Sequence, residues 1–224
     1  MSNESKYQIS ILGDSISTYA GYNPPENAVY YRDDRLYDNE LESVDDTWWM
    51  QVIAALQGEL VINESFSGSL VAGTSEACGC SDKRCSNLHA AQKPNLILVY
   101  MGTNDCGTIR NIGMERPNDC ECFYGAYRTM LQKIKRNYPE AKIVCATLPT
   151  WQCGGWGGEF AEEFARRAVR YNDAIKAAVQ EESCLLADLA CFDERYESNE
   201  DCHPNKRGHA QLASLWLKAL ECLL

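Results

Sequence analysis

The chain has 224 residues, enough to bury one sizeable hydrophobic core, and no stretch has the composition of a linker between domains. Its formal net charge of −11 would repel nucleic-acid phosphates and anionic lipids, so we expect neither nucleic acid nor a membrane as a partner. Residues 1–7 lack the basic start and apolar core of a secretory signal, and no apolar run is long enough to span a bilayer. The composition therefore predicts a single cytoplasmic domain over residues 1–224 and leaves the oligomeric state open.

The twelve cysteines would indicate a disulfide scaffold in a small secreted protein, but this chain is predicted to be neither small nor secreted. Cys145, Cys184 and Cys191 lie in or beside apolar runs, where a free thiol behaves as a small hydrophobic group. We therefore expect most of the thiols to be reduced.

The first half of the chain begins with an expected strand over 7–12, followed by a long ordered loop over 21–46 that is rich in Asn, Asp, Tyr and Pro. Residues 45–47 can cap a helix over 48–56, whose apolar positions recur at three- and four-residue spacing. A short strand over 60–63 and a strongly apolar strand over 95–100 complete this half.

The second half alternates in the same way. In chain order, we expect a helix over 123–137, a strand over 142–148, a helix over 160–178, a strand over 184–187 and a last helix from about 205 to the C-terminus. Strands that alternate with helices indicate a parallel sheet covered on both faces. The economical fold is a flavodoxin-like three-layer α/β/α sandwich with a five-stranded parallel sheet, and its ligands bind at the carboxyl ends of the strands.

Polar motifs follow the first three expected strands. Ser15 lies in a Gly-Asp-Ser-Ile-Ser turn, Gly68 ends an Asn-Glu-Ser-Phe-Ser-Gly segment, and Asn104 lies in a Gly-Thr-Asn-Asp turn. Each motif alone fits an ordinary turn, and Ser17 stands where the G-x-S-x-G elbow of α/β-hydrolases has its second glycine. The three nevertheless share one edge of the predicted sheet.

A fourth motif precedes the last expected helix. His203 is the one histidine of the three in the chain that is predicted to lie in a loop beside carboxylates, namely Glu200 and Asp201. Such a histidine is a surface group or a general base, and the surrounding fold decides between the two.

Taken together, the four motifs resemble those of the SGNH hydrolase superfamily of GDSL-like lipases and esterases, whose sequence blocks supply Ser, Gly, Asn and His in this order. The resemblance runs from the first strand to the last helix. It implies that Ser15 is the nucleophile and His203 its base, with the Ser15 N–H, the Gly68 N–H and the Asn104 side chain as oxyanion donors.

The same resemblance implies an acid that orients the imidazole. The family usually has Asp three residues before the histidine, where this chain has Glu200, while Asp201 lies two residues before it. We prefer Glu200 on register and keep Asp201 as an alternative.

Substrate contacts are expected from the loop that follows the fourth strand. Trp151 and Trp156 lie in or beside its Gly-rich stretch, and their indoles would stack on a sugar ring, line an acyl pocket or cover the core. The expected substrate is a small-molecule or carbohydrate ester carrying a short acyl or O-acetyl group.

A cysteine-rich segment offers zinc-type donors at Cys78, Cys80, Cys85 and His89. The spacing departs from the two-residue gaps of zinc sites, and the SGNH mechanism requires no metal, so we expect neither a metal nor another cofactor. Two alternatives to an esterase stay open. One is a non-catalytic binding domain of the same fold, suggested by the displaced acid, and the other is a cysteine-rich metal or redox protein.

Overall fold

The computed structural model describes residues 7–149, 159–199 and 202–224. Within these residues, five parallel strands form one sheet in the order β2-β1-β3-β4-β5, which is the flavodoxin-like order. The strands are β1 (Gln8–Gly13), β2 (Glu59–Asn63), β3 (Leu96–Tyr100), β4 (Lys142–Ala146) and β5 (Leu185–Ala187). The predicted fold class is confirmed.

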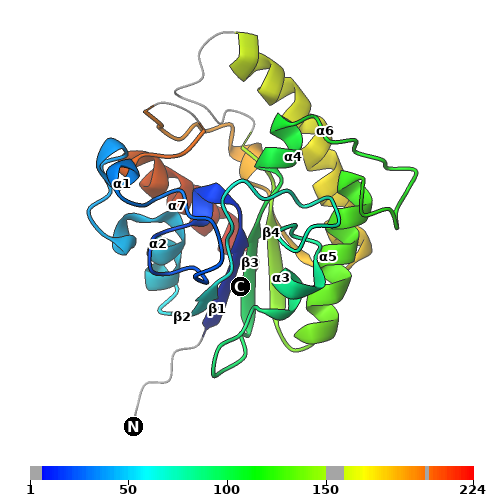
Figure 1. Ribbon diagram of the computed structural model, residues 1–224, viewed down its shortest axis with the longest axis horizontal. Helices are drawn as coiled ribbons and strands as arrows, with labels where there is room; N and C mark the ends of the chain where they lie inside the picture. Colours follow the sequence, from blue (N-terminus) through cyan, green and yellow to red (C-terminus); the bar gives the residue numbers. More distant parts are fainter. Residues whose placement is uncertain (1–6, 150–158, 200–201) are drawn as a thin grey trace.

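Helices cover both faces of the sheet (Figure 1). The longer ones are α2 (Trp48–Ala55), α5 (Phe123–Asn137), α6 (Glu159–Glu181) and α7 (Lys206–Leu220). Helices α2 and α7 pack together on one face, while α5 packs with α6 and α3 (Asp82–Ser86) on the other. Because the central strand β3 is covered on both faces, all five of its residues are buried, as its unbroken apolar run predicted.

The four longer helices lie where the apolar spacing predicted them, but the shorter elements were missed. They are α1 (Asp34–Asp38), α3, α4 (Thr103–Gly107) and the 3₁₀ helices η1 (Ser15–Ser17), η2 (Val44–Asp46) and η3 (Leu189–Phe192). Elements of three to five residues are too short to show a helical period. The segment predicted as a loop over 21–46 therefore contains α1 and η2.

Local hydrogen bonds account for two of the boundaries that differ from the prediction. The fourth strand was predicted to reach Leu148 but ends at Ala146, because the Leu148 N–H and C=O both bond to the side chain of Asn172, at 2.8 and 2.7 Å. The last helix begins at Lys206, and the Asn205 side chain caps it by accepting a 2.9 Å hydrogen bond from the Gly208 N–H.

The register of the sheet determines where the site forms. Gly13 at the end of β1 pairs with Tyr100 at the end of β3, so the loops after both strands leave the sheet at the same level. None of the helices in the described part of the chain has the length and apolar composition needed to cross a membrane.

Candidate active site

Ser15 and His203 meet at the carboxyl edge of the sheet. The His203 Nε2 lies 2.8 Å from the Ser15 Oγ, although 188 positions separate the two residues in the chain. This distance is within hydrogen-bond range and suits proton transfer from the hydroxyl to the imidazole. The Ser15 side chain is buried but reaches the histidine directly.

Ser15 is presented by a tight turn. It opens η1 immediately after β1, and the Asp14 side chain caps this short helix by accepting a 3.1 Å hydrogen bond from the Ile16 N–H. The Ser15 carbonyl accepts hydrogen bonds from both the N–H and the hydroxyl of Thr18, at 3.2 and 2.9 Å. The turn is therefore held on both sides of the serine.

The loop that carries His203 is held by two tyrosines from the segment before α1. The Tyr30 ring stacks on the imidazole, with ring centroids 3.4 Å apart and an interplanar angle of 9°. The buried Tyr31 donates a 2.8 Å hydrogen bond from its hydroxyl to the carbonyl of Pro204. The sequence contains no pattern that links these tyrosines to the histidine, and neither was predicted as a site residue.

Gly68 and Asn104 lie in adjacent loops at the same edge. Gly68 has φ +76°, a left-handed conformation that favours glycine, and a Cβ there would meet no atom within 4 Å. Asn104 lies in the first turn of α4, and its Nδ2 donates a 2.9 Å hydrogen bond to the carbonyl of Ser69. Among the described residues, the backbone N–H groups of Ser15 and Gly68 have no hydrogen-bond acceptor, so both are available to a ligand.

A buried arginine ties these loops together beneath the site. Arg84 is 1% exposed, and its guanidinium donates to the carbonyls of Gly13 and Glu64 at 2.7 and 2.6 Å, to the Ser69 hydroxyl at 2.9 Å and to the Ala77 carbonyl at 2.9 Å. Burial lowers the pKa of Arg84 to about 10, so the side chain stays charged at neutral pH. Sequence reasoning missed this residue, which lies among the cysteines considered for zinc.

Two buried carboxyls, those of Asp14 and Asp105, lie close enough to interact electrostatically. Burial raises the pKa of Asp14 to about 7, and one of its oxygens, Oδ2, has no hydrogen-bond partner. Burial also raises the pKa of Asp105 to about 6, although its two oxygens accept hydrogen bonds from the N–H groups of Val71 and Ala72, at 2.8 and 3.0 Å. Asp105 thus holds the chain just after the Gly68 loop against α4.

Four of the predicted site residues lie outside the described residues. Trp151 and Trp156, the expected substrate contacts, fall within residues 150–158. Glu200 and Asp201, the alternatives for the orienting acid, are residues 200–201. Their roles stay predictions.

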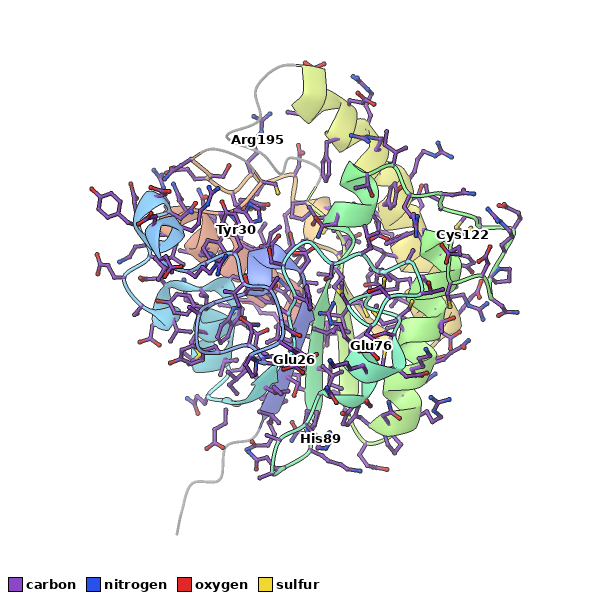
Figure 2. All side chains as sticks on the ribbon, in the orientation of Figure 1. Glu26, Tyr30, Glu76, His89, Cys122 and Arg195 are labelled. Carbon is purple, nitrogen blue, oxygen red and sulfur yellow. The ribbon has the colours of Figure 1, made fainter. Side chains whose placement is uncertain are left out.

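The cysteines considered for zinc do not come together with His89. The thiols of Cys78, Cys80 and Cys85 donate to backbone carbonyls at 3.2 to 3.4 Å, and His89 Nδ1 contacts the Tyr138 hydroxyl at 3.0 Å. Figure 2 shows His89 at the end of the sheet opposite Tyr30. In the described part of the chain no group of three or more His, Cys, Asp or Glu side chains is placed to hold a metal, and every cysteine there is a free thiol.

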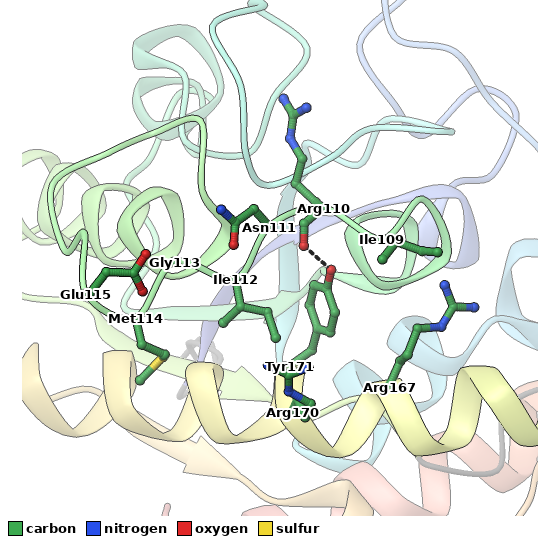
Figure 3. A pocket seen from close by; sticks show the side chains of 10 residues that line it. All are labelled: Ile109, Arg110, Asn111, Ile112, Gly113, Met114, Glu115, Arg167, Arg170 and Tyr171. Carbon is green, nitrogen blue, oxygen red and sulfur yellow. Dashed lines mark hydrogen bonds between the residues drawn. The ribbon is translucent and has the colours of Figure 1, made fainter.

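A cavity of about 450 Å³ lies beyond the end of α4, between the 109–115 segment and α6 (Figure 3). Its lining includes Arg110, Arg167, Arg170 and Tyr171, whose hydroxyl bonds to the Arg110 carbonyl. In Figure 3 the Arg110 side chain points away from the two arginines of α6, so the three charges do not converge on one point. Neither Ser15 nor His203 lines this cavity.

A three-layer α/β sandwich with a serine and a histidine paired at the carboxyl edge of its sheet has the architecture of a serine-type hydrolase. Residues 7–149 match the GDSL-like lipase/acylhydrolase family. The chain therefore belongs to this family and is an ester hydrolase of the SGNH type.

Individual proteins are similar to this chain in sequence or in structure. A multidomain esterase of Ruminococcus flavefaciens is 26% identical over 133 residues, which cover 57% of this chain but only 16% of that protein. Solved structures named as GDSL-like lipases from Bacteroides ovatus and Bacteroides uniformis are each 24% identical, with TM-scores of 0.72 and 0.74. They cover 96% and 97% of this chain, and it covers 98% and 96% of them.

An acetyl xylan esterase from Geobacillus stearothermophilus is also similar in structure, at 19% identity and a TM-score of 0.62. The alignment covers 96% of this chain and 95% of the Geobacillus chain. At this identity the similarity concerns the fold.

Proposed function

We propose that this ester hydrolase cleaves short acyl or O-acetyl esters of small molecules or carbohydrates through an acyl-serine intermediate. The observation that carries the proposal is the 2.8 Å contact between the Ser15 Oγ and the His203 Nε2. The names of two similar proteins, a multidomain esterase and an acetyl xylan esterase, support the substrate class. The net charge of −11 disfavours substrates embedded in anionic lipid.

In the first half of the reaction, the Ser15 Oγ attacks the ester carbonyl carbon and its proton passes to the His203 Nε2. The N–H groups of Ser15 and Gly68 and the side-chain amide of Asn104 donate hydrogen bonds to the resulting oxyanion. When the tetrahedral intermediate collapses, the alcohol leaves with the proton from His203, and the acyl group stays on the serine.

In the second half, water attacks the acyl carbon and gives a proton to the same nitrogen of His203. Collapse of the second intermediate returns that proton to the Ser15 oxygen and releases the carboxylic acid. One ester and one water thus give one acid and one alcohol. Glu200 or Asp201 would orient the imidazole through its other nitrogen.

The first test compares wild type with Ser15→Ala on p-nitrophenyl acetate. We expect kcat to fall by at least about 10³-fold, because removal of the nucleophile leaves only binding and oxyanion stabilisation. Ser17→Ala is the matched control. Ser17 is buried in the same turn, but its hydroxyl accepts a 3.2 Å hydrogen bond from the Trp48 indole rather than contacting the histidine.

Activity that survives Ser15→Ala unchanged would refute the mechanism. Wild-type protein without activity on any short ester would favour the alternative of a binding domain. A serine-directed phosphonate gives an independent readout, because mass spectrometry should locate it on Ser15. A series from acetate to octanoate esters then measures the acyl length that the site accepts.

A further inference from the structure

The stacked pair of Tyr30 and His203 is not accounted for by the reaction described above. Their rings are nearly parallel at van der Waals distance, so one face of the imidazole is covered by the tyrosine. Tyr30 lies near the same edge of the sheet to which β1 brings Ser15 (Figure 2). Rotation of the imidazole about its Cβ–Cγ bond would drive the edge of the ring into the tyrosine, so the stack opposes that rotation.

The backbone of Tyr30 is attached to the nucleophile turn. Its N–H donates a 2.9 Å hydrogen bond to the Thr18 Oγ1, and the Thr18 hydroxyl donates its own hydrogen to the Ser15 carbonyl at 2.9 Å. These two hydrogen bonds fix the position of the Tyr30 backbone relative to Ser15. Tyr30 therefore contacts His203 through its ring and is linked to Ser15 through its backbone.

The neighbouring tyrosine restrains the backbone beside the histidine. Tyr31 is fully buried, its hydroxyl bonds to Pro204, and its ring meets the Tyr30 ring edge-on at 4.9 Å. Residues 188–205, which connect β5 to α7, contain only η3 and an isolated bridge between Ser198 and Pro204 within their described part. The tyrosine pair thus supplies a restraint that regular secondary structure does not provide near His203.

We propose that Tyr30 is a positioning residue for the base, and this inference rests on the proposed function. Its ring keeps the imidazole plane aligned so that Nε2 faces the Ser15 hydroxyl. A displacement of about 1 Å at a reacting group costs up to about 10²-fold in rate. An attraction between the π-face and the imidazolium contributes less, because the Arg35 guanidinium already lies 5.3 Å from the centroid of the same ring.

The test uses three variants in the full chain with p-nitrophenyl acetate as substrate. Tyr30→Leu removes the flat ring, Tyr30→Phe keeps it, and Tyr37→Leu is the control, because Tyr37 is 87% exposed on α1. We expect Tyr30→Leu to lower kcat by about 10- to 100-fold with KM changed less than about twofold. Tyr30→Phe and the control should keep at least about half of the wild-type kcat.

Three outcomes would overturn the proposal. One is a wild-type kcat in Tyr30→Leu, another is an equal loss in Tyr30→Phe, and the third is a change confined to KM, which would make Tyr30 a wall of the substrate site. Failure of the proposed function is seen separately, as activity that does not depend on Ser15. A wild-type enzyme that needs Ser15 but tolerates Tyr30→Leu defeats this inference alone.

A spectroscopic readout covers the case in which the leucine variant does not fold. A stacked phenol shifts the ring-proton NMR signals of His203 upfield, and the chain has only three histidines, so His203→Gln assigns the signal. The shift should be present in wild type and in Tyr30→Phe. A His203 signal at its unstacked position in wild type would refute the proposal without any activity measurement.

Discussion

Replacing Arg84 with Met should destabilise the protein strongly, because it removes a buried cation that satisfies four acceptors. The guanidinium is 1% exposed and bonds to the carbonyls of Gly13, Glu64 and Ala77 and to the Ser69 hydroxyl. Each hydrogen bond from a charged donor contributes about 1.5–3 kcal/mol, but such values do not add within one group. Breaking a buried charged network by removing one partner costs about 3–5 kcal/mol in all.

For a chain of this size, 1 kcal/mol corresponds to about 2–4 °C in melting temperature, so we expect Arg84→Met to melt about 6–20 °C lower. Urea titration should show a lower midpoint with an unchanged slope. Arg84→Lys keeps the charge but cannot bridge all four acceptors. Its melting temperature should therefore lie between those of wild type and Arg84→Met. In both variants kcat should fall in the folded fraction, because Gly13 and Ser69 flank the Ser15 and Gly68 loops.

Arg128→Met is the matched control for this prediction. The Arg128 side chain is 18% exposed and pairs with Glu181 and Glu182 at 2.9 and 3.0 Å, away from the Ser15 turn. Arg128→Met should destabilise the fold less than Arg84→Met does and should leave kcat unchanged. A loss below about 1 kcal/mol in Arg84→Met would refute the reasoning, because four buried acceptors would then be satisfied without the guanidinium.

Three further predictions concern the site and its surroundings. Asn104→Ala should lower kcat on p-nitrophenyl acetate by about 10²- to 10³-fold with little change in KM, and an effect on KM alone would contradict its role as an oxyanion donor. Of Glu200→Gln and Asp201→Asn, only the variant of the orienting acid should lower kcat, by up to about 10⁴-fold, and equal small effects would mean that neither acid orients the base. Burial lowers the pKa of His209 to about 3, so the unfolded chain binds a proton there below about pH 6.5 while the folded chain does not. Acidification from pH 8 to pH 5 should therefore cost wild type about 2 kcal/mol more stability than His209→Leu in urea titrations, and parallel pH profiles would contradict this.

The pH prediction depends on the tautomer of His209. Its Nδ1 accepts a 3.1 Å hydrogen bond from the Trp48 N–H, so the neutral ring carries its hydrogen on Nε2. Protonation would place a hydrogen where the Trp48 N–H already points. Asp14 has the opposite slope, because its raised pKa removes stability as pH rises from about 3.8 to about 7. The comparison between wild type and the His209 variant isolates one group from the other.

The sequence-based predictions agree best with the structure where the pattern within one helix or strand was sufficient to predict it. Helix α5 begins at Phe123 and ends at Asn137, as its apolar spacing predicted, and β3 is as buried as its apolar run required. Ser15 and Asn104 were placed correctly at one edge because parallel strands deliver their following loops to the same side. The missed helix α3 has five residues, too few to show a period.

Local spacing and turn chemistry in the chain were sufficient for the order of strands and helices and for the edge of the sheet where Ser15 lies. Which side chains meet there depended on packing between distant segments. Tyr30 reaches His203 and Arg84 reaches Gly13 because loops from different strands converge at one edge. A local sequence pattern depends on interactions between residues close together in the chain. These partners lie 71 or more positions apart and come into contact only when the sheet has formed.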